Sequence, residues 1–205
     1  MLIGLHGKKK SGKDTAFGFI DDYFIQTAPN VVQKRYSEKM KQSAFRLFYP
    51  EIDAEDACQV SDYLKREIPC NSVSLTFEHE SGMEVVTCTG REFLQRYGTE
   101  SHRDLFGPDF WVDQCLPLGY DHSREVAVVT DVRFENEAQR IHDLGGTVWQ
   151  LLRPSEDQGD AHASEVPLPD ILIDIVIENT GTLEDFQRDV SNNLHQLTTG
   201  VHAHA

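Results

Sequence analysis

The sequence is short of several features that would place the protein in other classes. No run approaches the roughly 18 apolar residues that a membrane-spanning helix needs. The first residues, MLIGLHG, lack the basic start, long apolar stretch and small-residue cleavage site of a secretory signal. Hydrophobic residues make up 39% and charged residues 26% of the 205-residue chain, which is ordinary for a globular protein. We therefore expect a cytoplasmic protein that folds as one domain around a buried core.

Paired cysteines are also missing. Cys58, Cys70, Cys88 and Cys115 are widely spaced and form no C-x-x-C motif. This spacing disfavours a disulfide framework and a zinc site, and it indicates reduced, mostly buried thiols.

Positive charge is scarce, and lysine is absent after Lys65. The net charge is −15, from 34 acidic and 19 basic residues, so the chain repels nucleic acid at long range. We expect no nucleic-acid polymer and no membrane as a partner. The lysines at positions 8, 9, 10 and 13 crowd one segment, and a local positive focus on an acidic body suits a small polyanionic ligand.

What is present is an alternation of strand and helix patterns. This alternation predicts an α/β fold with a parallel sheet covered on both faces. Residues 72–89 depart from it, because alternating apolar residues on both sides of a turn at Ser81-Gly82 indicate an antiparallel hairpin. We expect strands at 2–6, 31–36, 125–130, 147–152 and 174–178, and helices at 13–25, 39–48, 53–66, 91–97, 136–144 and 183–197. We expect a polar loop at residues 154–169 and a disordered tail at 198–205.

The segment GKKKSGKDT, residues 7–15, carries the clearest chemistry. It follows an expected strand and opens an expected helix, which is the context of a P-loop. Gly7 and Gly12 allow backbone angles that turn successive N–H groups toward phosphate oxygens, and the helix N-terminus adds partial positive charge. Lys13 has the reach to follow the β and γ phosphates of a nucleoside triphosphate. The alternative is a glycine-rich turn in a lysine-rich region. We expect the phosphate contacts to come from Gly7, Lys9, Lys10, Ser11, Gly12, Lys13, Asp14 and Thr15.

One position departs from the usual P-loop pattern. The residue after the loop lysine is normally Ser or Thr, whose hydroxyl binds Mg²⁺, and here it is Asp14. A carboxylate can hold Mg²⁺ directly or through water. Alternatively, Asp14 only favours the first turn of its helix. Thr15 would then donate to the α-phosphate.

Together with three later segments, this loop resembles the phage-type deoxynucleoside monophosphate kinase family. The segments are TGREFLQRYGTESHRDLFGPDFWV at 89–112, VVTDVRFENEAQRIHDLGGTVWQLLRP at 128–154, and DAHASE at 160–165 followed by IENTGTLEDF at 177–186. The resemblance covers nearly the whole chain in consistent order and is more specific than a lone P-loop.

The resemblance implies an adenylate-kinase-like α/β fold with a five-stranded parallel sheet, and the reaction ATP + dNMP → ADP + dNDP with Mg²⁺. It also implies a single kinase domain over 1–197, an acceptor-binding insertion at 50–118 and a lid loop at 153–170. The acidic residues for Mg²⁺ would be Asp14 and Asp131. A viral source would place the enzyme in the host cytoplasm, and a homodimer is compatible with the family.

Two arginines would act on the transferring phosphoryl group. Asp131 and Arg133 are expected just past the C-terminal end of a strand, where open α/β sheets bind ligands. Arg133 has the forked guanidinium that suits a phosphate, and the alternative is a surface ion pair with Glu135 or Glu137. Arg153, at the base of the lid, would close over ATP. His162 and Glu165 lie within the expected lid loop, in the segment DAHASE that resembles the family.

The resemblance places the acceptor nucleotide on a helix and the turn after it. Arg91 and Gln95 lie four residues apart on one helical face, an arginine for the phosphate and an amide for the base edge. Trp111 and Phe110 would stack on the base, although aromatics at this density are as often core residues. The acceptor residues implied are Ser37, Lys41, Arg91, Gln95, Thr99, Glu100, Arg103 and Trp111.

Several alternatives remain open from the residues alone. Ser37 and Lys41, expected at the end of the second strand and on the next helix, equally suit a helix N-cap and a solvated lysine. Asn179 and Gly181 match the turn beside the adenine, or form a plain strand–helix turn with Thr182 as cap. Kinases of dephospho-coenzyme A or phosphomevalonate share the general fold, and a non-catalytic nucleotide-binding regulator would keep the loop without turnover.

Overall fold

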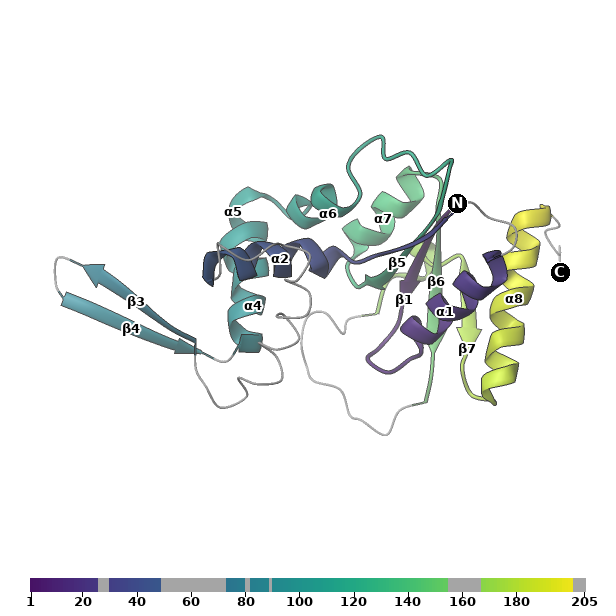
Figure 1. Ribbon diagram of the computed structural model, residues 1–205, viewed down its shortest axis with the longest axis horizontal. Coiled ribbons are helices and arrows are strands. Elements are labelled where there is room, and N and C mark those ends of the chain that lie inside the picture. Colours follow the sequence, from purple (N-terminus) through teal and green to yellow (C-terminus); the bar gives the residue numbers. More distant parts are fainter. Residues whose placement is uncertain (26–29, 49–72, 80–81, 89, 155–166, 201–205) are drawn as a thin grey trace. The chain divides into compact units, whose positions relative to one another are not determined.

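The computed structural model describes residues 1–25, 30–48, 73–79, 82–88, 90–154 and 167–200 (Figure 1). The chain divides into two compact units, residues 1–35 with 115–205, and residues 36–114. The helix expected at 53–66 and the lid residues His162 and Glu165 lie outside the described residues. The domain boundaries inferred from the sequence stay a prediction.

The first unit is built on a five-stranded sheet in the order β2-β5-β1-β6-β7. Every neighbouring pair is parallel, which confirms the predicted α/β class. The strands are β1 (Leu2–His6), β2 (Val31–Lys34), β5 (Val126–Val132), β6 (Thr147–Leu152) and β7 (Ile175–Glu178). Because all strands run the same way, their C-terminal ends meet at one edge, and that edge holds the P-loop.

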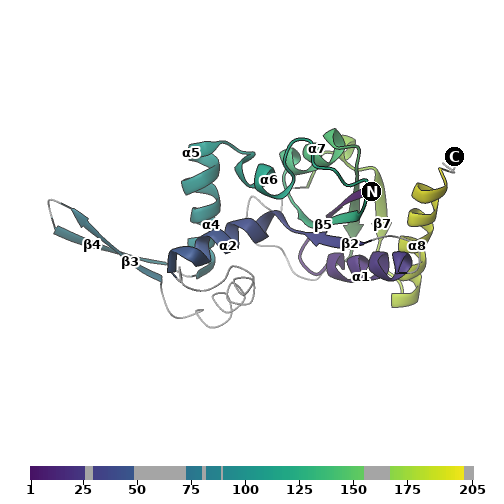
Figure 2. The ribbon, with the colours of Figure 1, turned by 45° about the horizontal axis from the view of Figure 1, so that its top comes forward.

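Helices cover both faces of this sheet (Figures 1 and 2). On one face, α1 (Lys13–Phe24) and α8 (Leu183–Thr199) pack over a core that includes Leu5, Ile20, Trp149 and Phe186. On the other face lies α7 (Glu135–Asp143), whose Ile141 is fully buried. Gly4 in β1 lies so close to Ile141 that a Cβ there would overlap its side chain, which explains a glycine inside a buried strand.

Several element ends differ from the sequence prediction. The second strand stops at Lys34 and α2 (Tyr36–Phe48) begins at Tyr36, so Ser37 lies in the first turn of a helix and not at a strand end. The strand expected at 125–130 continues through Asp131 to Val132, so only Arg133 of the pair lies past it. At the far end of the chain, α8 runs to Thr199, and a left-handed Gly200 with φ 67° ends it. After the loop predicted at 154–169, the chain forms the short 3₁₀ helix η3 (Asp170–Leu172) before β7, which the sequence pattern did not predict.

The described residues of the second unit form helices and a hairpin. Strands β3 (Val73–His79) and β4 (Gly82–Cys88) pair antiparallel, as predicted. Helix α4 (Gly90–Gly98) packs on α2 through Ala44, Phe93 and Leu94. It continues into a π-helical turn, η1 (Thr99–Arg103), and the short helix α5 (Asp104–Phe106), and α6 (Phe110–Cys115) follows. Sequence periodicity gave no indication of the π-helical turn. Cys115 is buried, as expected.

Candidate functional site

The P-loop connects β1 to α1 through backbone angles that few residues adopt. The φ angles are 151° at Gly7, 65° at Lys10 and 105° at Gly12. A Cβ on Gly7 would come within 2.6 Å of the Leu151 carbonyl oxygen, and one on Gly12 within 2.7 Å of Asn179 Nδ2. Both glycines are therefore required by conformation and by space, and the turn they create is the kind that groups backbone N–H donors around an anion.

The Lys13 side chain reaches back to the start of this loop. Its Nζ donates to the carbonyl oxygens of Gly7 at 2.6 Å and Lys8 at 2.8 Å. The Ser11 hydroxyl is buried, and among the described residues it has no hydrogen-bond partner. A buried hydroxyl without a partner is costly, and a phosphate oxygen would satisfy it. The lysine and the hydroxyl thus give the loop a cation and a donor for a polyanion.

Asn179, in the turn after the edge strand β7, holds the P-loop in place. Its side-chain Nδ2 donates to the Ser11 carbonyl oxygen at 3.0 Å, and its backbone N–H donates to Leu152 O at 2.7 Å. The turn after β7 is thereby attached to the P-loop, although 168 residues separate Asn179 from Ser11. Thr182 does cap α8, and its hydroxyl accepts from the Asp185 N–H at 3.2 Å.

Asp14 belongs to a polar network that the sequence did not reveal. Its Oδ1 accepts from Arg35 Nη2 at 3.1 Å and from Gln33 Nε2 at 3.4 Å. Gln33 also donates to Thr130 Oγ1 at 3.1 Å, which connects the ends of β2 and β5 to the first turn of α1. The Asp14 side chain is 82% exposed, so the ion pair with Arg35 is a weak one that a stronger cation can displace.

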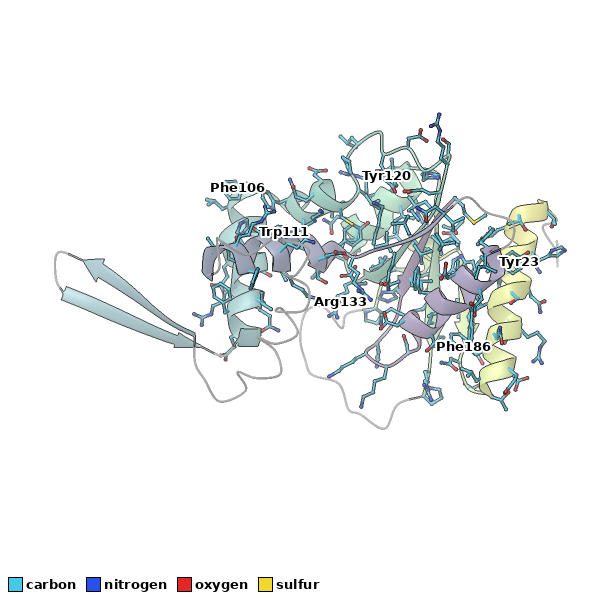
Figure 3. The ribbon with its side chains drawn as sticks, in the orientation of Figure 1. Tyr23, Phe106, Trp111, Tyr120, Arg133 and Phe186 are labelled. Atoms are coloured by element: carbon cyan, nitrogen blue, oxygen red, sulfur yellow. The ribbon has the colours of Figure 1, made fainter. Side chains whose placement is uncertain are left out.

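Arg133 projects from a backbone segment that is held in place. The buried Glu137 accepts from the N–H groups of Arg133 at 2.8 Å and Phe134 at 3.2 Å through Oε2, at the start of α7. The Glu137 carboxylate therefore holds the backbone before the helix, and the Arg133 side chain is exposed. Figure 3 shows this side chain at the edge of the sheet.

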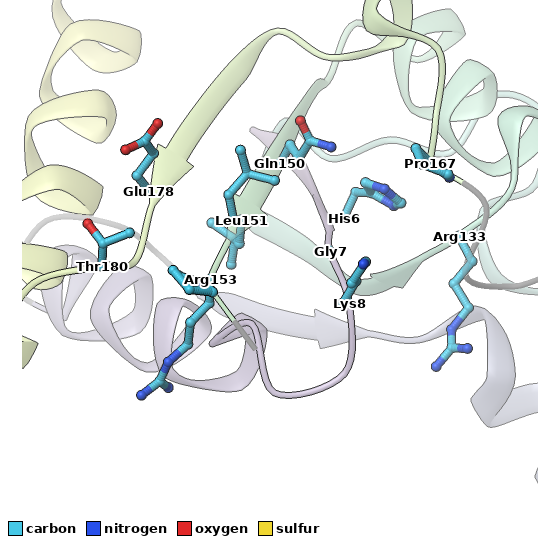
Figure 4. A pocket seen from close by; sticks show the side chains of 12 residues that line it. His6, Gly7, Lys8, Arg133, Gln150, Leu151, Arg153, Pro167, Glu178 and Thr180 are labelled. Carbon is cyan, nitrogen blue, oxygen red and sulfur yellow. The ribbon is translucent and has the colours of Figure 1, made fainter. Parts of the chain in front are cut away.

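A pocket of about 510 Å³ opens at this edge (Figure 4). His6, Gly7 and Lys8 line it from the end of β1, and Gln150 through Pro154 line it from the end of β6. The guanidinium groups of Arg133 and Arg153 flank the P-loop turn in this view. The rest of the lining comes from Pro167, Glu178 and Thr180. The arginine and lysine side chains beside this loop form a cationic site for a phosphorylated ligand.

The residues expected to bind the acceptor all belong to the second unit. Gln95 is half-buried in α4, and Thr99, Glu100 and Arg103 lie in the π-helical turn. Glu100 forms an ion pair with Arg96, at 4.0 Å. Arg91 lies in α4 four residues before Gln95, whereas Ser37 and Lys41 lie in α2.

Trp111 is a core residue. Its side chain is 3% exposed, and its indole Nε1 donates to the Gly98 carbonyl oxygen at 3.0 Å. The ring lies among Tyr97, His102 and Phe110, with centroid distances of 6.2, 4.7 and 4.7 Å. Of the two alternatives for Trp111, this arrangement favours packing over stacking on a base. Phe106 in the same cluster is 62% exposed.

Two acidic residues at the C-terminal edge of the sheet have the chemistry that a magnesium ligand needs. Within the described part of the chain, no group of three or more His, Cys, Asp or Glu residues could hold a metal ion. Mg²⁺ commonly takes one or two carboxylates and completes its octahedron with nucleotide phosphates and water. Asp14, exposed at the first turn of α1, and the half-buried Asp131 at the end of β5 have the oxygen donors for such a site. No described helix is long and apolar enough to cross a membrane.

Comparisons with known proteins identify the family. The family described as deoxynucleotide monophosphate kinase matches residues 72–190, more than half of the chain. A putative deoxynucleotide monophosphate kinase of Acanthamoeba polyphaga mimivirus is 28% identical over 93% of this chain and 94% of its own length. The deoxynucleotide monophosphate kinase of Escherichia phage RB69 is 25% identical over 94% of this chain and 99% of its own.

The chain belongs to the deoxynucleotide monophosphate kinase family. Membership confirms the resemblance inferred from the sequence motifs, and it makes the chain a nucleotide kinase. Among solved structures, a dephospho-CoA kinase from Campylobacter jejuni aligns over 98% of both chains with a TM-score of 0.47 and 14% identity. A likeness at that level carries no argument about the substrate.

Sequence reasoning missed several polar residues of this kinase's P-loop edge. Gln33, Arg35 and Thr130 form the network around Asp14, and His6 and Gln150 line the pocket. Gln33 and Arg35 follow the apolar start of β2, and Thr130 ends the apolar run of β5, so polar residues at strand ends were the available signal.

Proposed function

We propose that this kinase transfers the γ-phosphoryl group of ATP to a deoxynucleoside monophosphate. An oxygen of the acceptor phosphate forms the new bond to the γ phosphorus, and the bond from that phosphorus to the bridging β–γ oxygen breaks, which leaves ADP. The observation that carries the proposal is the P-loop of residues 7–15, with its left-handed residues and Lys13 across its mouth, in a chain of this family.

Phosphoryl transfer needs positioned charge more than covalent chemistry. The loop N–H groups and the Ser11 hydroxyl would hold the β and γ phosphates, with Lys13 following the charge as it moves to the leaving oxygen. Arg133 and Arg153, which line the same pocket, would close on the transferring group. Asn179 and Gly181 would support the loop and the nucleotide from the turn after β7.

Mg²⁺ would be held by Asp14 and Asp131, directly or through water. When bound, the ion neutralises phosphate charge. The Asp14 carboxylate would then give up its ion pair with Arg35 and bind the metal ion instead. Its hydrogen bond from Gln33 would keep it near the end of β5. Thr15, exposed in the first turn of α1, would donate to the α-phosphate.

The acceptor would bind to the second unit, which carries the other set of expected residues. Arg91 would take the acceptor phosphate and Gln95 the base edge, with Thr99, Glu100, Arg103, Ser37 and Lys41 around them. Trp111 would act by packing beneath this surface, because its indole is buried and hydrogen-bonded to Gly98. Residues 1–197 would work as one kinase domain in the cytoplasm, without a nucleic-acid polymer, and as a monomer or homodimer.

The test is a panel of the common dNMPs and NMPs with ATP and Mg²⁺. We expect ADP formation that depends on an added dNMP, with the matching dNDP as second product. Dephospho-coenzyme A and phosphomevalonate serve as the competing acceptors. ADP formation with one of these and none with any nucleotide would refute the proposal, and ATP binding without turnover on any acceptor would indicate a regulator.

A further inference from the structure

His6 is a buried polar residue at the point where β1 enters the P-loop. Its side chain is 7% exposed, it lines the pocket, and it directly precedes Gly7 (Figure 4). A buried imidazole in an apolar strand is costly unless its nitrogens are satisfied. The chain keeps a histidine here, although every other residue of β1 is apolar.

The His6 ring makes a long-range hydrogen bond. Nδ1 lies 3.0 Å from the Val132 carbonyl oxygen at the end of β5. A carbonyl oxygen only accepts, so Nδ1 carries the proton and donates. The N–H of the same peptide unit is that of Arg133, and it donates to Glu137 Oε2 at 2.8 Å. Two buried side chains, His6 and Glu137, therefore hold both polar groups of the peptide that leads into Arg133.

This peptide lies where β5 changes register. Gly4 pairs with Val129 but His6 pairs with Val132, so β5 has one residue more than β1 in this interval. In an unbroken strand, residues 128 and 132 would face the same side. Val128 instead packs in the core beneath α1 and α8, whereas Val132 faces Gly4 and Ile141 on the α7 side. A bulge of this kind redirects the side chains that follow it.

We propose that His6 is a positioning residue that sets Arg133 relative to the P-loop. By donating to Val132 O, it fixes the bulged end of β5, and with Glu137 it orients the peptide from which the Arg133 side chain leaves. The inference rests on the proposed function for its effect on turnover. His6 acts through Arg133 and has no chemical step of its own.

The first test combines substitutions at both positions. His6→Leu should lower kcat about tenfold with the KM for ATP within about twofold, because misplacement of a catalytic group by about 1 Å costs up to about a hundredfold. In an Arg133→Ala background, the same change should lower kcat less than about twofold, since residues that act together are not additive. An equal loss in both backgrounds would overturn the proposal.

Two further variants separate positioning from stability. His6→Asn keeps a donor at the distance of Nδ1 and should restore kcat to within about threefold of the wild type. His122→Leu is the matched control, because His122 Nε2 also bonds a backbone carbonyl, that of Leu144 at 2.9 Å, and His122 lies outside the pocket lining. Its kcat should stay at the wild-type value. A kcat for His6→Asn as low as that of His6→Leu, or an equal loss with His122→Leu, would refute the role.

Hydrogen exchange tests the same inference without turnover. His6→Leu should accelerate exchange of the Arg133 amide at least about tenfold, and His122→Leu should not. If the wild-type protein showed no dNMP-dependent ADP formation, the proposed function would fail, while faster exchange at Arg133 would still support the positioning. Unchanged exchange in His6→Leu would overturn the inference by itself.

Discussion

The carboxylate of Asp14 accepts a hydrogen bond from Arg35 at 3.1 Å, so the residue that replaces the usual P-loop Ser or Thr is attached to the end of β2. If Asp14 also holds Mg²⁺, Asp14→Asn should raise the Mg²⁺ concentration for half-maximal rate at least about tenfold. Asp21→Asn, an exposed aspartate on the same helix, is the control. An unchanged Mg²⁺ dependence would show that Asp14 does not bind the metal and only stabilises the first turn of α1.

Removal of the loop lysine should abolish transfer while the fold survives. Lys13→Ala should lower kcat at least about a hundredfold, because the cation stabilises charge that develops in the transition state. Thermal unfolding should change little, since Lys13 Nζ donates to backbone carbonyls of a partly exposed loop and lies outside the apolar core. Arg124→Ala makes the same charge change before β5 and should keep full activity. Near-normal turnover in Lys13→Ala would contradict the P-loop assignment.

Two glycines, one in the P-loop and one in the helix after it, should respond in opposite directions to alanine. At Gly12, φ is 105° and a Cβ would lie 2.7 Å from Asn179 Nδ2, so Gly12→Ala should cost about 1–3 kcal/mol of unfolding free energy and weaken ATP binding. At Gly18, inside α1, nothing lies within 4 Å of the position that a Cβ would take, and Gly18→Ala should stabilise by about 0.5–1 kcal/mol. Urea unfolding measures both. Equal effects would show that the loop geometry is not required.

Arg91 should be specific for the acceptor. Arg91→Ala should raise the KM for the monophosphate about tenfold or more and leave that for ATP nearly unchanged, because a guanidinium–phosphate pair is a strong, charge-assisted contact. Arg96→Ala is the control on the same helix, where Arg96 makes an exposed ion pair with Glu100 at 4.0 Å. Equal shifts in both KM values would remove Arg91 from the acceptor site.

The start of α8 should show a defined acid dependence. The Thr182 hydroxyl, then the Thr182 N–H and Arg188, lower the pKa of Asp185 below its ordinary value of 3.8. A lowered folded-state pKa gives stability that is present above the unfolded pKa and lost as the pH falls through the folded one. Asp185→Asn should therefore lower Tm at pH 7, and its difference from the wild type should shrink below pH 3.8. Glu184→Gln, a change at the neighbouring residue, should lower Tm at pH 7 by less than Asp185→Asn does. A gap that stays constant as the pH falls well below 3.8 would contradict this cause.

Local patterns in the sequence predicted the P-loop part of the site well. Leu2 through His6 is a buried run, and the glycines and Lys13 follow it at once, so strand, loop and helix could be assigned from contiguous residues. The strand ends were predicted less accurately, because they depend on pairing with neighbouring strands. Polar Asp131 reads as the end of a strand, but backbone pairing with β1 carries β5 to Val132.

The sequence by itself determined the α/β alternation, the hairpin, the P-loop and the family motifs, because periodicity, glycine placement and residue spacing are local properties. The tertiary structure decided which distant residues meet. The strand order β2-β5-β1-β6-β7 is not the order along the chain. That order brings Arg35 to Asp14 and Asn179 to Ser11, and a one-residue register shift lets His6 hold the peptide before Arg133. These contacts follow from sheet pairing and burial, which no local pattern encodes.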